Sequence, residues 1–512
     1  MDRTVYTFNV SQAPYVEVDA TIHDIEALPQ RFYSGGDLAW VMVASVLVFL
    51  MVPGLSLFYS GILPPKVALQ NAWLPLMTAA VIGIQWYLWG YAVTFSNWPD
   101  DTTFWGGAGG IALNDALLRP VPAFRNNGRD GPYVPEILYV LFEGMFASFT
   151  AALVAGAAAM KDRPGHFLIF IVLWATFVYD PIARWTWNLE GWSNKWGTLD
   201  FAGGSAVHIC AGATVLAHCV FHKFILPKME AAMGGIHPDP THEIPMGQLN
   251  GQGNGMNGGL HGHHPPLADP VALVSDPIST DHTNVLLGTL FLWIGWFGFN
   301  GGSALSASVR AVSACVSTHL AACAGAVTHC ALTAIVEFLS SDGDGEAAAP
   351  RVKPFRFSVV DFCNGAVIGL VAITPAAGFV PHSLAVVFGI IPTIICWALY
   401  GLSLLVDDKQ FIVVIHGIGG FVGMLMTGFF ARGSVAALDG TTLPHACRGG
   451  LDGHWIQLAI QFGDACAASG YAFVVSLAIL VVLEPMMFYF RRRQTRTSEE
   501  VDDSQVIVEC RP

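Results

Sequence analysis

Two histidines stand alone inside apolar segments of this chain, and small residues follow each of them. His208 closes the stretch Asp-Phe-Ala-Gly-Gly-Ser-Ala-Val-His, and His416 opens the stretch His-Gly-Ile-Gly-Gly. Imidazole donates and accepts hydrogen bonds through its two ring nitrogens. An ionisable group inside a bilayer costs several kcal/mol, so it usually faces a cavity or a partner. The two histidines therefore indicate a pore lined by a pair of imidazoles.

The segments that carry these histidines have the composition of membrane spans. The chain has 512 residues, of which 53% are hydrophobic and only 12% are charged. Its apolar stretches repeatedly reach about 20 residues, the length that crosses a hydrocarbon core. We predict an all-α polytopic membrane protein with eleven transmembrane helices, at residues 37–60, 70–95, 136–160, 166–187, 200–223, 284–304, 310–339, 358–376, 382–406, 411–431 and 455–490.

The charge distribution predicts an orientation. Residues 1–36 are polar and lack the basic and apolar regions of a cleaved signal, so the first span should be an uncleaved anchor with the N-terminus outside. Eleven spans then put the C-terminus in the cytosol. Basic residues follow the positive-inside rule on that side: Lys66, Lys161, Arg163, Lys223, Lys228, Arg351, Lys353, Arg356, Lys409 and Arg491 to Arg493. The net charge of −14 comes mostly from loops and tails, and no basic face for nucleic acid is present.

Three regions follow from this topology. Residues 1–36 are an extracellular segment, residues 37–490 are the membrane domain, and residues 491–512 are a solvated, partly disordered cytosolic tail. Within the membrane domain, residues 227–283 form a Gly-rich and His-rich cytosolic insert that reads as a flexible linker, with metal binding by Leu-His-Gly-His-His-Pro as the alternative. The ten cysteines form no CxxC pair and read as buried small hydrophobic residues.

The two histidines occupy matching places, in spans five and ten. If the first ten spans form two inverted five-helix halves, followed by the eleventh helix, both histidines approach the midplane near a pseudo-two-fold axis. We expect the two side chains to touch there. The Gly and Ala residues that crowd the spans are expected to serve close helix packing.

Five motifs, in order, resemble the ammonium transporters of the Amt/Mep/Rh superfamily between about residues 37 and 490. They are Val-Pro-Gly-Leu-Ser-Leu-Phe-Tyr-Ser-Gly (52–61), Leu-Asp-Phe-Ala-Gly-Gly-Ser-Ala-Val-His (199–208), Ile-Gly-Trp-Phe-Gly-Phe-Asn-Gly-Gly-Ser (294–303), Thr-Pro-Ala-Ala-Gly (374–378) and His-Gly-Ile-Gly-Gly (416–420). The phrase Asp-Pro-Ile-Ala-Arg-Trp-Thr-Trp-Asn (180–188) resembles the Mep-type permeases of fungi and related eukaryotic microbes.

The resemblance implies a homotrimer in the plasma membrane that takes up ammonium or methylammonium through one pore per subunit, with no cofactor. It implies an outer recruitment site, a phenyl gate below it, and twin histidines lower in the pore. Residue by residue, the recruitment site is Trp187, Ser303 and Phe146 with Asp200 nearby, the gate is Phe146 and Phe299, and the twin histidines are His208 and His416.

The residue types fit these roles independently. An aromatic face holds an ammonium ion by about 0.5 to 2 kcal/mol, and a hydroxyl oxygen accepts its hydrogen bond. Asp200 has a second reading as the N-cap of span five, and the two readings are compatible. Ammonium can shed a proton and cross an apolar gate as neutral ammonia, whereas K⁺ cannot. Whether the proton follows, making transport electrogenic, stays open.

Several residues depart from the family pattern. Phe411 stands where many members have an aspartate, although Asp407 and Asp408 lie just upstream, so the family pattern leaves open which residue supports span ten. Glu143 often corresponds to a glutamine. Asp180 and Arg184 place charges near the outer site, where they could pair with each other. The tail 491–512 does not match the family's C-terminal stretch.

Two other classes and one modification site complete the predictions. An ammonium sensor with low flux would keep the same pore. A metalloenzyme would need a third ligand at helical spacing, and neither pore histidine has one. A CO₂ pore of the Rh type fits the aromatic motif less well. Asn9, in Asn-Val-Ser, is the only N-glycosylation sequon and lies in the expected extracellular segment.

Overall fold

The structure is a computed structural model. It describes residues 6–9, 17–20, 33–96, 103–107, 111–113, 120–122, 125–126, 129–130, 133–158, 164–232, 281–340 and 358–509. The predicted insert lies outside these residues from 233 to 280, and so does its histidine cluster.

The first half of the bundle contains the helices up to residue 232. They are α2 (Gly35–Ile62), α3 (Pro65–Gln85), η2 (Trp86–Gly90), α4 (Tyr91–Phe95), η3 (Ile111–Leu113), α5 (Glu136–Ala158), α6 (Pro164–Trp174), η4 (Ala175–Tyr179), α7 (Asp180–Trp187), α8 (Trp192–Trp196), η5 (Gly204–Ile209), α9 (Cys210–Val220), η6 (Phe221–Ile225) and α10 (Leu226–Ala232).

The second half begins at residue 282 and ends with one long helix. Its helices are α11 (His282–Gly302), α12 (Val309–Ser340), α13 (Val359–Ile373), α14 (His382–Leu405), η8 (Val413–Ile418), α15 (Gly419–Phe430), α16 (Gly433–Ala436), η9 (Ala437–Asp439), η10 (Gly450–Asp452) and α17 (Ile456–Glu509).

Short antiparallel strand pairs lie before α2 and in the connection that leads to α5. β1 (Tyr6–Asn9) pairs with β2 (Glu17–Ala20), β3 (Pro120–Pro122) with β6 (Tyr133–Pro135), and β4 (Arg125–Asn126) with β5 (Arg129–Asp130). Asn9 is opposite Glu17 in the first pair. These strands form no sheet inside the bundle, so the fold is the predicted helical one.

The helices confirm the predicted spans. Among the described residues, ten helices are long and apolar enough to cross a membrane, and α13 is a shorter apolar helix between them. Several begin at a side-chain cap, as Asp281 accepts hydrogen bonds from the N–H groups of Thr283 at 3.0 Å and Asn284 at 3.2 Å. The chain is therefore a multi-pass membrane protein.

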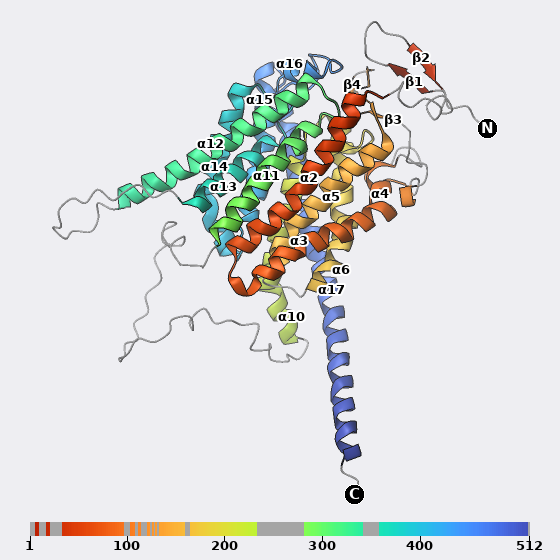
Figure 1. Cartoon of the computed structure of the whole chain (residues 1–512), viewed down its shortest axis with the longest axis vertical. Coiled ribbons are helices and arrows are strands. Elements are labelled where there is room, and N and C mark those ends of the chain that lie inside the picture. The colour runs from red at the N-terminus through yellow and green to blue at the C-terminus, as the bar shows by residue number, and fades with distance from the viewer. Residues whose placement is uncertain are drawn as a thin grey trace, which may run out of the picture.

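Helices of the two halves pack against each other along the bundle: α2 packs along α11, η5 packs on α15, and α9 packs on η8. Within the second half, α12 packs on α13 and α14. Figure 1 shows the α15–α16 region at one end of the bundle and α17 projecting from the other. We call these the upper and lower ends. The backbone of α17 is helical as far as Glu509, where the sequence predicts a partly disordered tail.

Candidate functional site

Asp200 fixes the start of the segment that carries His208. Its carboxylate accepts hydrogen bonds from the N–H groups of Gly203 at 2.9 Å, Gly204 at 2.6 Å and Ser205 at 2.8 Å. Gly203 has φ 116°, a left-handed conformation that favours glycine. The carboxylate satisfies N–H groups that a helix start leaves without partners. Asp200 therefore acts as the predicted helix cap.

Asp408 performs the same task in the second half. Its Oδ2 accepts the N–H of Val413 at 2.8 Å and the hydroxyl of Ser403 at 2.9 Å. Asp200 and Asp408 each precede a pore histidine by eight residues and each bind the N–H five residues on. This spacing is a signal that the sequence carried and that sequence reasoning missed.

Asp408 removes the doubt raised by Phe411. The support of span ten comes from the Asp408 carboxylate, while the Phe411 ring packs against Tyr400 with ring centroids 4.7 Å apart. An aspartate at position 411 is therefore not needed to cap η8 in this chain.

His208 and His416 touch at the centre of the bundle, as expected. Both lie on π-helical turns, η5 and η8, and both are buried. Their Nδ1 atoms are 3.1 Å apart, a hydrogen-bond distance. The helices approach this closely because Gly212 faces the backbone of Gly417, where a side chain would collide.

A hydrogen-bond chain through Thr374 assigns the protons of the two imidazoles. The Thr374 hydroxyl donates to the carbonyl of Leu370 at 2.8 Å, so its oxygen accepts from Trp296 Nε1 at 2.9 Å and from His208 Nε2 at 3.3 Å. His208 then carries its proton on Nε2 and accepts at Nδ1. His416 in turn donates from Nδ1 and has a bare Nε2.

Aromatic rings lead from the upper end to the histidines. Trp187 meets Phe146 edge-on at a centroid distance of 5.7 Å, and Phe146 stacks on Phe299 at 4.2 Å. The His208 ring is nearly parallel to Phe299 at 6.1 Å. The predicted recruitment, gate and histidine residues therefore follow one another in a single column.

A cavity of about 340 Å³ lies above this column, and we call it the upper cavity. All four predicted recruitment residues line it, namely Phe146, Trp187, Asp200 and Ser303. Trp187 Nε1 donates to the backbone carbonyl of Asp200 at 3.2 Å, and the Ser303 hydroxyl donates to the carbonyl of Phe299 at 2.8 Å. The Ser303 oxygen can therefore accept a hydrogen bond from a bound cation.

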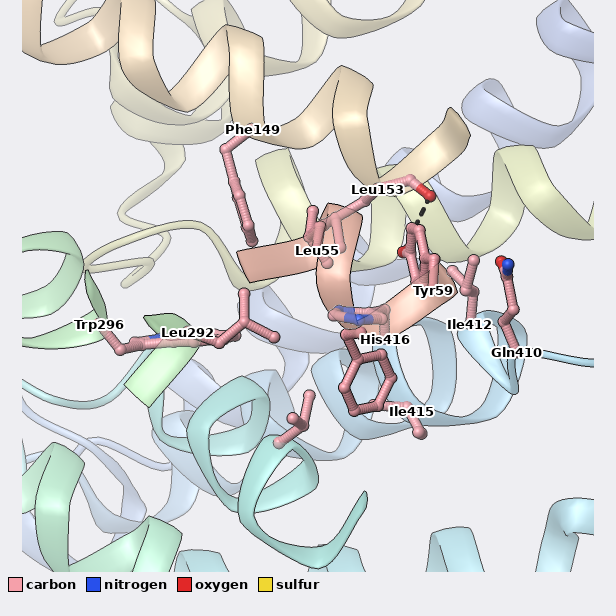
Figure 2. Close-up of a pocket in the computed structure, with 12 residues that line it drawn as sticks. Leu55, Tyr59, Phe149, Leu153, Leu292, Trp296, Gln410, Ile412, Ile415 and His416 are labelled. Atoms are coloured by element: carbon pink, nitrogen blue, oxygen red, sulfur yellow. Dashed lines mark hydrogen bonds between the residues drawn. The ribbon is translucent and has the colours of Figure 1, made fainter. Parts of the chain in front are cut away.

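A much smaller space lies on the other side of the histidines, and we call it the lower cavity. It measures about 10 Å³, close to the room that one water needs. Figure 2 shows His416, Tyr59 and Gln410 around it among apolar side chains. The Tyr59 hydroxyl donates to the Leu153 carbonyl at 3.2 Å. The column is thus polar and wide above, apolar and narrow below.

The C-terminal helix α17 holds the segment that contains Asp200. The Asp464 carboxylate accepts from the hydroxyl of Ser205 at 2.5 Å and from that of Ser193. The Gln461 side chain bonds both the N–H and the carbonyl of Leu199, at 2.8 and 2.7 Å. Helix α17 therefore positions the start of η5.

A buried ion pair holds the same segment from the other side. Arg310 Nη1 lies 3.0 Å from Asp439 Oδ2, and its guanidinium packs between the rings of Phe201 and Phe379 at 5.0 and 4.9 Å. Burial opposes the charge of Asp439, but Arg310 and hydrogen bonds from Thr442 outweigh it, so the pKa of Asp439 lies below its usual value.

Asp180 and Arg184, two further departures from the family pattern, form hydrogen bonds with neighbouring helices. Asp180 accepts from Gln85 Nε2 at 2.8 Å, and Arg184 donates to the carbonyls of Thr94 and Ser96 at 3.0 and 2.8 Å. Neither lines the upper cavity, so the charges predicted near the outer site serve packing of α7 on its neighbours.

Three other histidines of the membrane helices form ring contacts or hydrogen bonds with neighbouring side chains, as predicted. His329 Nε2 lies 3.0 Å from the Tyr400 hydroxyl, His319 packs on Trp293, and His218 packs on His222. In the described part of the chain, no three His, Cys, Asp or Glu residues could hold a metal, and the cysteines are free.

Comparisons with known proteins place this pore in a family. The sequence pattern of the Ammonium Transporter Family matches residues 39–246 and 277–506. Ammonium transporter 1 of Schizosaccharomyces pombe is 38% identical over 455 residues, which are 88% of this chain and 77% of that protein. Ammonium transporter MEP2 of Saccharomyces cerevisiae is 33% identical over 469 residues, which are 91% of this chain and 81% of that protein.

A solved structure agrees with these relatives. The crystal structure of Candida albicans Mep2 has a TM-score of 0.70 and 34% identity, and the match covers 92% of this chain and 88% of that one. Fold and site define a membrane transporter rather than an enzyme. The chain belongs to the Ammonium Transporter Family, and the expected likeness to fungal Mep proteins is confirmed. It transports ammonium.

The hydrogen-bond chain predicts a role for Thr374 in transport. Replacing Thr374 with Val keeps the shape but removes the oxygen that accepts from His208 and Trp296, leaving two buried N–H groups unpaired. We expect methylammonium uptake to fall about tenfold or more with normal amounts of folded protein. Thr427→Val is the matched control, because Thr427 is a buried threonine that bonds only its own helix, to Gly423. Equal uptake by the two variants would contradict the role.

Proposed function

We propose that this protein recruits NH₄⁺ in the upper cavity, where the ion gives up a proton to solvent, and passes neutral ammonia between Phe146 and Phe299 to the pair His208 and His416. The observation that carries the proposal is the 3.1 Å contact between the two buried imidazoles below the stacked phenyl rings. Figure 2 shows His416 among the residues that line the lower cavity.

Hydration explains why the ion must lose its proton. A monovalent cation leaving water for an apolar passage loses its hydration, and neither stacked phenyl rings nor the apolar lower cavity replace it. K⁺ has the same charge and no proton to give up. Ammonium can leave its proton behind and cross as a neutral molecule that makes hydrogen bonds. Selectivity then follows from chemistry rather than from pore width.

The upper cavity provides partners for the charged form. A cation between Trp187 and Phe146 faces two aromatic rings, and the Ser303 oxygen accepts one of its hydrogen bonds. The Asp200 carboxylate contributes through its field, because backbone N–H groups already occupy its oxygens. Phe146 and Phe299, 4.2 Å apart, must rotate to let ammonia through.

The histidines provide partners for the neutral form. His416 presents a bare Nε2 when His208 donates to Thr374, so this nitrogen can accept a hydrogen bond from ammonia. Ammonia can therefore act as a hydrogen-bond donor to the histidine pair as it passes. Current recording with an ammonium pulse distinguishes electrogenic transport from electroneutral transport. A protein that signals in response to ammonium but carries little flux would instead be a sensor.

We propose further that the protein is a homotrimer of the plasma membrane that serves nitrogen uptake, with the N-terminus outside and the C-terminus in the cytosol. The similarity to fungal Mep transporters and the basic residues on the predicted cytosolic side support this arrangement. The upper cavity then faces the exterior, where ammonium is captured.

The twin histidines give the first test. His208→Ala and His416→Ala should each reduce selective methylammonium uptake to background, because either change breaks the shared hydrogen bond. The double variant should be no worse than the single ones. His319→Ala, a histidine on α12 outside both cavities, should transport normally. Normal flux with intact K⁺ exclusion in both pore variants would refute the relay.

The recruitment residues give the second test. Trp187→Leu and Ser303→Ala should raise the half-saturating concentration of methylammonium, by roughly 2- to 30-fold for Trp187, the range of a cation–π contact. Competition by K⁺ should increase at the same time. Trp293→Leu, a tryptophan that packs on His319 away from the cavity, is the control. Unchanged concentration dependence in both recruitment variants would place the site elsewhere.

The sequon gives a test of orientation. If the N-terminus is outside and the protein is made in a eukaryotic host, Asn9 should carry an N-glycan, since it lies well before α2 begins at Gly35. We expect an endoglycosidase shift that disappears in Asn9→Gln. An N-terminal epitope that external protease reaches only after the cells are permeabilised would contradict the orientation.

A further inference from the structure

Two carboxylates line the upper cavity, and their hydrogen bonding differs. Asp200 binds three backbone N–H groups and so serves the fold. Glu143 is 7% exposed, and its Oε2 has no hydrogen-bond partner among the residues that the structure describes. A buried carboxylate oxygen without a partner is costly, and its presence needs an explanation. A positively charged ligand in the cavity would supply the missing partner.

The position of Glu143 places it beside the aromatic recruitment residues. It lies on α5 three residues before Phe146, a rise of about 4.5 Å along the helix. Tyr139, one turn further toward the upper end, hydrogen-bonds the Glu143 side chain and also lines the cavity. The tyrosine holds the carboxylate in place, and the second oxygen remains for a ligand.

Apart from Tyr139 and Asp200, the other charged or titratable groups in the lining lie in one connection, which also contributes Cys447. His445, Arg448 and His454 belong to the connection between α15 and α17, whereas Glu143 is on α5 next to the gate. A cation that moves toward Phe146 therefore leaves the basic groups behind and approaches the carboxylate.

We infer that Glu143 is a cation-binding residue of the upper cavity, whose Oε2 accepts a hydrogen bond from ammonium or methylammonium while the ion lies against Trp187 and Phe146. The inference rests on the proposed recruitment step and adds a formal negative charge to it. A charge-assisted hydrogen bond is about twice as strong as a neutral one, so this contact dominates the affinity of the cavity for the cation.

The variant Glu143→Gln tests the inference, because it keeps the shape and the bond from Tyr139 but removes the charge. We expect the half-saturating concentration for methylammonium uptake to rise about tenfold, with a nearly unchanged maximal rate. Glu143→Asp should recover part of the affinity. Glu136→Gln is the matched control, since Glu136 lies two turns earlier on α5, accepts from Tyr91 at 2.9 Å and does not line the cavity.

A binding measurement separates this inference from the transport proposal. Methylammonium chloride should raise the melting temperature of the purified wild type and of Glu136→Gln more than choline chloride does, and should raise that of Glu143→Gln less. If the wild type transports and Glu143→Gln has unchanged uptake and stabilisation, the inference is wrong and the transport proposal stands. If the wild type shows no flux but the stabilisation depends on Glu143, the cation site stands and the transport proposal fails.

Discussion

The hydrogen bond between His208 and His416 sets the condition that the rest of the bundle must meet. Two helices that carry buried imidazoles have to approach within 3.1 Å at their ring nitrogens, in the middle of a membrane protein. Small residues make that approach possible, as at Gly212 and Gly417. The π-helical turns η5 and η8 lie at this contact, and such turns are frequent at functional sites.

Each half of the protein secures its histidine in the same way. An aspartate eight residues earlier caps the start of the turn, so N–H groups that would be orphaned in the membrane are satisfied. The two ends of the column differ in size and polarity. The upper end has a cavity of about 340 Å³ with carboxylates, and the lower end has about 10 Å³ among apolar groups. This asymmetry suits a substrate that arrives as a cation and continues as a neutral molecule.

The segment that contains Asp200 is held from two sides. Helix α17 holds the Asp200 segment through Asp464 and Gln461, while Arg310 holds it through Phe201. The buried pair of Arg310 with Asp439 is costly to desolvate, and removing one partner would leave a charge uncompensated. These contacts keep the aromatic column in register, because they fix the loop whose carbonyl receives the Trp187 N–H.

The sequence by itself determined the class of fold, the spans and the identity of the column residues. Apolar runs of about 20 residues predict membrane helices, and isolated His208 and His416 in small-residue contexts indicate a role other than core packing. The sequence could not show which carboxylate oxygens already accept hydrogen bonds from the protein. Asp200 and Glu143 are both acidic residues near one cavity, and only the tertiary contacts show that backbone N–H groups take up the first and leave an oxygen of the second unbonded. Thr374 was visible in a motif, but its link to His208 joins helices 166 residues apart. Such contacts depend on how helices cross in space, and local periodicity carries no record of that.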